Sequence, residues 1–183
     1  SFQYLTTYID EKLTPEQKSW LTAVIADFKK SKEEGNFLYQ FSLCSRKLKN
    51  KEGLFFCGLE FPHFNLIEIT RIYLLLSYCQ IAQKKFDEIY QKLRVTADLH
   101  ETITLYKGLS FFPPSTALNR SAEEGLRSNM KEVFEAVALD NLYPAKYFDE
   151  NSWNQMVLKA LFVESPIYRI IGFNKRKNDN LNR

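Results

Sequence analysis

Glycine and proline are scarce in this chain of 183 residues, which has six of each. Glycine makes up about 3% of the chain, against an average of about 7% in globular proteins. β-Sandwiches and barrels need many tight turns, which these two residues commonly supply. Their scarcity, together with 45% hydrophobic residues, therefore predicts long helices around a substantial core and excludes global disorder.

Long hydrophobic runs are also missing. The longest, Ile72–Cys79, contains a serine and falls well short of the ~18 residues that a membrane span requires. The first residues lack the basic segment followed by an apolar stretch that marks a secretory signal. We therefore expect a cytoplasmic protein that reaches a membrane only through a partner.

Histidine, cysteine and net charge are equally limited. There are two histidines, His63 and His100, and three cysteines, Cys44, Cys57 and Cys79, with neither a CxxC nor an HExxH motif. We therefore expect no metal site and no cofactor, and cysteines within apolar runs are typical of reduced core residues. The formal net charge of +3 is too small to indicate a nucleic-acid partner.

Helix-start signals occur along the whole chain. Thr14-Pro15-Glu16-Gln17 combines a capping threonine, a proline suited to the first helical position and a glutamine that completes a capping box. Asp98 with Glu101 repeats the box. The apolar segment Phe64–Gln80 is too long for one strand and predicts a central helix over 64–80.

Three more helices are expected in the C-terminal half. Ser115 is the predicted cap of one, Asn129 with Glu132 of the next, and Ser152 with Gln155 of the last. Seven or eight helices with short connections predict an all-α fold, either a single-domain multi-helix bundle or a short α-solenoid-like stack. We expect one domain over residues 1–183, with N-terminal helices in 1–95 and a second half in 97–178.

Two charged residues lie on the apolar side of the predicted central helix. Glu68 and Arg71 both face apolar neighbours such as Ile72 and Leu75. Either they form an internal ion pair, or Arg71 points into a cavity where its guanidinium could hold a carboxylate or phosphate. The sequence leaves both alternatives open.

The last long helix also carries an amide among apolar residues. A buried amide without partners costs on the order of 1–3 kcal/mol, so we expect Asn154 to bond to neighbouring backbone or to a ligand. Gln155 and Lys159 share the opposite face as surface or pocket-rim residues.

A turn is expected at Asn141–Pro144. Asp140, just before it, could accept hydrogen bonds from turn amides or point into a cleft. Arg127 and Asn129 lie at a predicted helix junction, and a helix N-terminus favours an anion.

A series of short motifs runs in order through the C-terminal half. They are Ala97–Glu101, Leu105–Leu109, Glu124–Met130, Val133–Asn141, Tyr143–Phe148, Trp153–Phe162 and Tyr168–Phe173. This series resembles the EboA family, whereas the N-terminal half agrees only in its helical character and in Arg71–Leu76. The resemblance implies a place in gene clusters for secondary-metabolite biosynthesis or precursor transfer, which also encode a membrane prenyltransferase-like protein and sugar-metabolism-like enzymes. It implies no established catalytic residue.

These observations predict a helical binding or accessory protein with an anion-binding pocket between the central and C-terminal helices. The expected ligand is a small anionic or prenylated metabolite, and the expected partner is the membrane prenyltransferase-like protein. The candidate ligand-binding residues are Glu68, Arg71, Arg127, Asn129, Asp140, Asn141, Asn154, Gln155 and Lys159.

Two alternatives remain open. The first is an enzyme of the same pathway in which a carboxylate acts as acid or base, the candidates being Glu68, Glu101 and Asp140. The second is a scaffold that docks the membrane partner through exposed aromatic residues, namely Tyr143, Tyr147 and Phe148.

Overall fold

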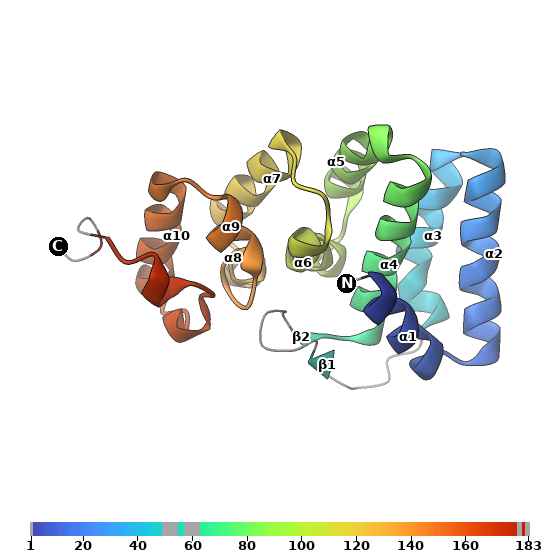
Figure 1. The fold of residues 1–183 in the computed structure, drawn as a ribbon, viewed down its shortest axis with the longest axis horizontal. Helices are drawn as coiled ribbons and strands as arrows, with labels where there is room; N and C mark the ends of the chain where they lie inside the picture. Colours follow the sequence, from blue (N-terminus) through green and yellow to red (C-terminus); the bar gives the residue numbers. More distant parts are fainter. Residues whose placement is uncertain (1, 49–54, 57–62, 179–180, 182–183) are drawn as a thin grey trace. The chain divides into compact units, whose positions relative to one another are not determined.

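The computed structural model describes residues 2–48, 55–56, 63–178 and 181 (Figure 1). In this part of the chain there are ten α-helices and one sheet of two two-residue strands, β1 (Phe55–Phe56) and β2 (His63–Phe64). The all-α class is therefore confirmed, although the described residues form more helices than the seven or eight predicted. Cys57 lies outside the described residues.

The chain divides into two compact units, each described here by itself. The first comprises residues 1–55 with 64–101, and the second comprises 56–63 with 102–183. The division near residue 101 lies a few residues after the boundary expected between the two halves. The single domain expected over residues 1–183 stays a prediction.

The helices of the first unit precede residue 102. They are α1 (Phe2–Lys12), α2 (Pro15–Ser31), α3 (Glu34–Lys47), α4 (Leu66–Ile81), α5 (Phe86–Thr96) and the start of α6 (Leu99–Lys107), with a 3-10 turn at Gln83–Lys85. Of these, α1 has none of the predicted start signals.

Capping boxes begin three of these helices. At α2 the Thr14 side chain accepts from the Gln17 amide while the Gln17 side chain accepts from the Thr14 amide, as predicted. The Asp98–Glu101 box at α6 forms in the same reciprocal way. At α4 the cap is Asn65, whose partner is Glu68.

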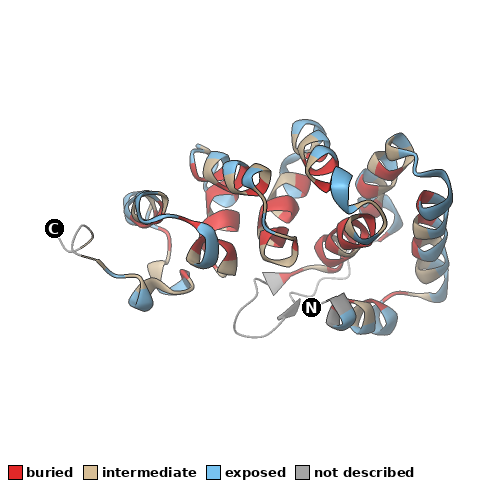
Figure 2. Cartoon of the chain, turned by 45° about the horizontal axis from the view of Figure 1, so that its top comes forward, coloured by how far each residue is buried: buried red, intermediate tan, exposed pale blue. Residues whose placement is uncertain are grey.

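The predicted central helix is confirmed as α4, which packs against α1, α2 and α3. Eleven of its 16 residues are buried, as an all-round apolar helix requires. Tyr78 stacks on Phe28 with ring centroids 4.5 Å apart and lies 4.8 Å from the Phe37 ring, so α2, α3 and α4 share an aromatic core. Figure 2 shows the buried residues of α4 as a nearly continuous red helix.

The second unit contains the rest of α6 and all later helices. They are α7 (Thr116–Leu126), α8 (Lys131–Ala138), α9 (Leu142–Tyr147) and α10 (Glu150–Phe162), with 3-10 turns at Gly108–Phe111, Ile167–Arg169 and Phe173–Lys175. Ser115 caps α7 as predicted, because its hydroxyl accepts from the Leu118 amide.

Two predicted caps and one predicted turn are wrong. The residue at the N-cap of α8 is Met130, and Ser128 rather than Asn129 accepts from its amide. The segment expected as a turn at 141–144 is the start of α9, capped by the Asn141 side chain. α10 begins earlier than expected, because Asp149 offers a carboxylate to the Ser152 amide at 2.7 Å.

Candidate functional site

Glu68 and Arg71, two predicted site residues of the first unit, bind different partners. The Glu68 carboxylate accepts from the Asn65 amide at 2.8 Å, which completes the cap of α4. Arg71 is 2% exposed; its Nε donates to the Phe41 carbonyl at 3.2 Å and an Nη2 donor reaches Glu101 Oε1 at 3.0 Å. The internal ion pair therefore exists, but its acid is Glu101 of α6 rather than Glu68. Both of these guanidinium contacts go to protein groups.

Asn141 in the second unit is a buried structural amide. Its Nδ2 donates to the carbonyls of Tyr106 and Ala136, at 2.9 and 3.0 Å. Its Oδ1 accepts from the Ser110 hydroxyl and from the Tyr143 amide. The side chain thus joins the end of α6, α8 and the start of α9, and it leaves little hydrogen-bonding capacity for a ligand.

Asp140 fastens the turn at 167–169 to the end of α8. Its carboxylate accepts from Arg169 Nε at 2.8 Å and from an Arg169 Nη, and its amide donates to the Arg169 carbonyl at 2.8 Å. The pKa of Arg169 is raised, chiefly by this hydrogen bond with Asp140. Asp140 also adopts a left-handed backbone conformation (φ 49°), which aspartate tolerates better than most residues.

Asn154 is half-buried and pairs with another amide. Its Nδ2 donates to Asn178 Oδ1 at 3.2 Å, and Asn178 Nδ2 donates back to Asn154 Oδ1 at 2.9 Å. The expectation of a bonded amide is therefore met by a side chain from the C-terminal segment, not by neighbouring backbone.

A groove between α8 and α10 brings together three of the predicted residues: Asn129, Gln155 and Lys159. This α8–α10 groove has a volume of about 720 Å³, and it is also lined by Ser128, Lys131, Phe134, Leu158, Phe162 and Val163. Leu158 and Phe162 are 50% and 87% exposed. The groove therefore offers an apolar wall beside two lysines. Arg127 is exposed and is not among the lining residues.

The two lysines of the groove already have partners. The Lys159 ammonium donates to the carbonyls of Leu126 and Ser128 at the end of α7 and lies 5.1 Å from the centre of the Phe134 ring. Partial burial lowers its pKa. The Lys131 ammonium donates to the Glu164 carbonyl at 3.3 Å. Lys159 thus neutralises the negative end of α7, and less charge is left for an anion.

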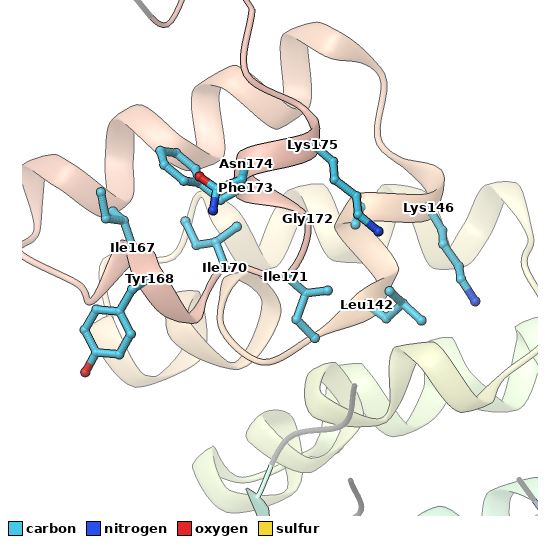
Figure 3. Close-up of a pocket in the computed structure, with 11 residues that line it drawn as sticks. Leu142, Lys146, Ile167, Tyr168, Ile170, Ile171, Gly172, Phe173, Asn174 and Lys175 are labelled. Atoms are coloured by element: carbon cyan, nitrogen blue, oxygen red, sulfur yellow. The ribbon is translucent and has the colours of Figure 1, made fainter. Parts of the chain in front are cut away.

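A second hollow, of about 690 Å³, adjoins α9 (Figure 3). This α9 hollow is lined by Leu142, Ala145, Lys146, Ile167, Tyr168, Ile170, Ile171, Gly172, Phe173, Asn174 and Lys175. Figure 3 shows Lys146 and Lys175 at one end and Ile167 with Tyr168 at the other. Neither lysine ammonium group has an ion-pair or hydrogen-bond partner among the described residues.

The residues that line the α9 hollow were not predicted as site residues, although the sequence holds a signal for them. Seven belong to the two motifs Tyr143–Phe148 and Tyr168–Phe173, and the second motif has an apolar cluster outside any long helix. Three predicted polar residues hold the surrounding elements in place without lining the hollow. Asn141 caps α9, Asp140 fixes the turn at 167–169, and Asn154 binds Asn178.

The hollows contain no carboxylate in their linings. This holds for the α8–α10 groove, for the α9 hollow, and for a third hollow in the first unit that is lined by Ile25, Lys29, Lys32, Tyr73, Ser77, Gln80 and Ile81. The three acids considered for catalysis have contacts that build the fold. Glu68 caps α4, Glu101 binds Arg71, and Asp140 binds Arg169.

The prediction that a scaffold would expose three aromatic residues is wrong for two of them. Tyr143 and Phe148 are 1% and 4% exposed and form part of the core; Tyr143 lies on the buried side of α9, and Phe148 is the C-cap of that helix. Tyr147 is 41% exposed. Among the described residues, no group of three or more His, Cys, Asp or Glu side chains could hold a metal ion.

The family comparison decides where this chain belongs. The sequence profile described as metabolite traffic protein EboA matches residues 1–183. The chain is a member of the EboA family. No curated protein and no solved structure matches it significantly. The EboA resemblance, seen mainly in the C-terminal half of the sequence, thus extends over both units.

None of the helices described for this EboA-family chain is long and apolar enough to span a bilayer. The pocket expected between the central and C-terminal helices stays a prediction, because α4 and α10 belong to different units. The α9 hollow and the α8–α10 groove each lie within the second unit.

Proposed function

We propose that this chain is an accessory protein of a secondary-metabolite pathway that binds a small amphiphilic anion, such as a prenyl phosphate, in the α9 hollow. The observation that carries the proposal is the pair of ammonium groups of Lys146 and Lys175, which have no partner in the described part of the chain, beside an apolar lining with no acidic residue. An anionic head group suits the lysines, and an isoprenoid tail suits the isoleucines and Phe173. The family description as a metabolite traffic protein agrees with binding without chemistry.

The α8–α10 groove is the less favourable site for an anion. Its two lysines already donate to backbone carbonyls, so an anion would have to compete with those contacts. The lysines of the α9 hollow have no such competitors in the described structure.

Three related probes test the proposal by isothermal titration calorimetry: geranyl phosphate, geraniol and inorganic phosphate. We expect geranyl phosphate to bind more tightly than either of the others. The double variant Lys146→Met/Lys175→Met is expected to weaken geranyl phosphate binding about 10- to 100-fold, at about 1.4 kcal/mol for each tenfold change, and to leave geraniol binding nearly unchanged.

The matched control is Lys30→Met/Lys84→Met, which removes two exposed lysines of the first unit that line none of these hollows. Absence of saturable geranyl phosphate binding would overturn the proposal. Equal affinities of the lysine variant and the control would overturn the assignment to the α9 hollow.

The membrane prenyltransferase-like partner is a further part of the proposal, and it is supported by the family resemblance alone. Co-purification of the two proteins from cells that express both is its test. We expect added geranyl phosphate to change the amount of each protein that is recovered with the other. If the two proteins do not co-purify at all, the partner is removed from the proposal.

A further inference from the structure

We infer that residues 172–178, here called the C-terminal strap, form a lid on the α9 hollow, and that Arg176 is the positioning residue that keeps the lid closed. The inference rests on the proposed function for the identity of the ligand. The strap supplies four lining residues of the hollow: Gly172, Phe173, Asn174 and Lys175. In Figure 3 Phe173, Asn174 and Lys175 lie above Ile170 and Ile171, along the upper edge of the hollow.

Arg176 binds the strap to α9 through its guanidinium. Nη1 donates to the Pro144 carbonyl at 2.9 Å and to the Ala145 carbonyl at 3.4 Å, and Nη2 donates to the Phe148 carbonyl at 2.9 Å. These acceptors lie at the C-terminal end of the helix, where a cation is favourable. One side chain therefore holds the strap against the same helix that contributes Lys146 to the hollow.

The same guanidinium also reaches α10. Its central carbon lies 4.5 Å from the centre of the Trp153 ring, which is completely buried. A cation over an indole face is the strongest arrangement of this type, and Arg is well suited to it because the planar group stacks. Arg176 thus fixes the strap to two helices at once.

Two further contacts show that the strap is seated rather than merely adjacent. Gly172 has a positive φ of 84°, and a Cβ there would lie 3.1 Å from the Ala145 Cβ, so the backbone at Gly172 lies so close to α9 that any side chain there would be crowded. At the other end, the reciprocal amide pair of Asn154 and Asn178 closes the strap on α10.

Apart from Arg176, the strap is held at its two ends, by the close approach of Gly172 to Ala145 and by the Asn154–Asn178 pair. Between these ends its backbone amides donate only to carbonyls of the strap or of the residues just before it: the Lys175 and Arg176 amides donate to the Gly172 carbonyl, and the Phe173 amide donates to the Ile170 carbonyl. Short 3-10 turns of this kind are weak alone, so loss of the Arg176 contacts should open the strap while the helices stay folded.

Amide hydrogen exchange tests the lid without any ligand. In the variant Arg176→Met we expect the protection factors of the amides at positions 173, 175 and 176 to fall at least about tenfold. The amides of α10 should keep their protection. Arg176→Lys retains the charge and loses the planar fork, so its effect should be intermediate. Arg46→Met, an exposed arginine of α3, is the control. Unchanged protection in Arg176→Met would overturn the inference.

Stopped-flow kinetics with geranyl phosphate test whether the strap gates the hollow. Opening a lid more often should raise the association and dissociation rate constants together, by about tenfold, with little change in Kd. A rise in the dissociation rate alone would show a lost wall contact and would overturn the lid. Asn178→Ala, which releases only the far end of the strap, should raise both rate constants by a smaller factor.

The two proposals fail in different ways. If the wild-type chain does not bind geranyl phosphate, the proposed function fails, and the exchange measurement still decides whether Arg176 holds the strap. If geranyl phosphate binds and Arg176→Met exchanges it at the wild-type rates, the proposed function stands and the lid is overturned.

Discussion

Arg71 of α4 and Glu101 of α6 form a salt bridge of 3.0 Å in the interior of the first unit, with side chains 2% and 6% exposed. The Arg71 guanidinium also lies 5.4 Å from the centre of the Phe41 ring. Glu101 also takes part in the cap of α6, where its other carboxylate oxygen accepts from the Asp98 amide. A buried pair of this kind contributes little compared with apolar residues, but it is costly to break.

Removing one partner of this pair should be strongly destabilising. In Arg71→Met the Glu101 carboxylate stays buried without its cation, so we expect the free energy of unfolding to fall by about 3–5 kcal/mol. Urea denaturation followed by circular dichroism measures this fall. The second variant is Arg71→Met/Glu101→Gln, in which glutamine is uncharged and still accepts from the Asp98 amide. We expect this double variant to recover at least ~2 kcal/mol, and equal stability of the two variants would contradict the assignment.

Asn141 should contribute more to stability than to binding. In Asn141→Ala the carbonyls of Tyr106 and Ala136 lose their partner, as do the Ser110 hydroxyl and the Tyr143 amide. Buried groups left without partners cost about 1–3 kcal/mol each before relaxation, so we expect a total loss of about 3 kcal/mol. The control Asn129→Ala removes an exposed amide and should change the midpoint of thermal unfolding by less than about 2 °C. Similar midpoints for the two variants would show that the amide network is not needed.

Local signals in the sequence were sufficient for much of the helical pattern. The capping residues Thr14, Asp98 and Ser115 act as predicted, since each depends only on residues within one helical turn. The cap of α10 was misassigned because Asp149, three residues before Ser152, is also a good capping residue. Which of two caps begins a helix depends on where the preceding segment ends, and that is fixed by α9 and its packing.

Long-range contacts account for the main errors at the site. A helical wheel placed Glu68 near Arg71 but could not show that Glu101, 30 residues later, lies closer. The Asn65–Glu68 spacing was a usable sign that Glu68 belongs to a cap. The α9 hollow was missed because most of its lining comes from 3-10 turns and irregular chain, which lack a hydrophobic periodicity, and because Arg176 binds carbonyls 28–32 residues earlier.

The Cys44 thiol should resist modification while the first unit is folded. Burial raises its pKa from 9.0 to about 12, although the nearby Arg71 charge opposes the rise. The reactive thiolate is thus far rarer than in the unfolded chain. In Cys57→Ser/Cys79→Ser, which keeps only this cysteine, we expect iodoacetamide at pH 8.5 to react about 10³-fold more slowly with the folded protein than in urea. Comparable reaction rates in folded and unfolded protein would contradict the buried position.

The same pKa difference makes the stability of the fold depend on pH. Because the unfolded thiol ionises first, the Cys44 thiol should destabilise the fold progressively as pH rises above 9.

Gly125 of α7 should not tolerate even one methyl group. A Cβ at this position would lie 2.8 Å from the Tyr106 ring and 2.8 Å from a Val137 methyl, both of which belong to buried side chains. Alanine is normally favoured over glycine in a helix by about 1 kcal/mol, so Gly125→Ala would be stabilising if space were available. Overpacking in a close-packed interior costs about 1–3 kcal/mol and should outweigh that gain, so we expect a net loss of about 1–2 kcal/mol in the free energy of unfolding, measured by urea denaturation.

Gly35→Ala in α3 is the matched control, because a Cβ there would meet nothing within 4 Å and should stabilise the chain slightly. If both substitutions stabilise the protein, α6, α7 and α8 do not approach as closely as the structure shows. If Gly125→Ala destabilises the protein and Gly35→Ala does not, the double variant Gly125→Ala/Val137→Ala identifies the cause. Partial recovery of stability in that variant shows that the close contact with Val137 is responsible.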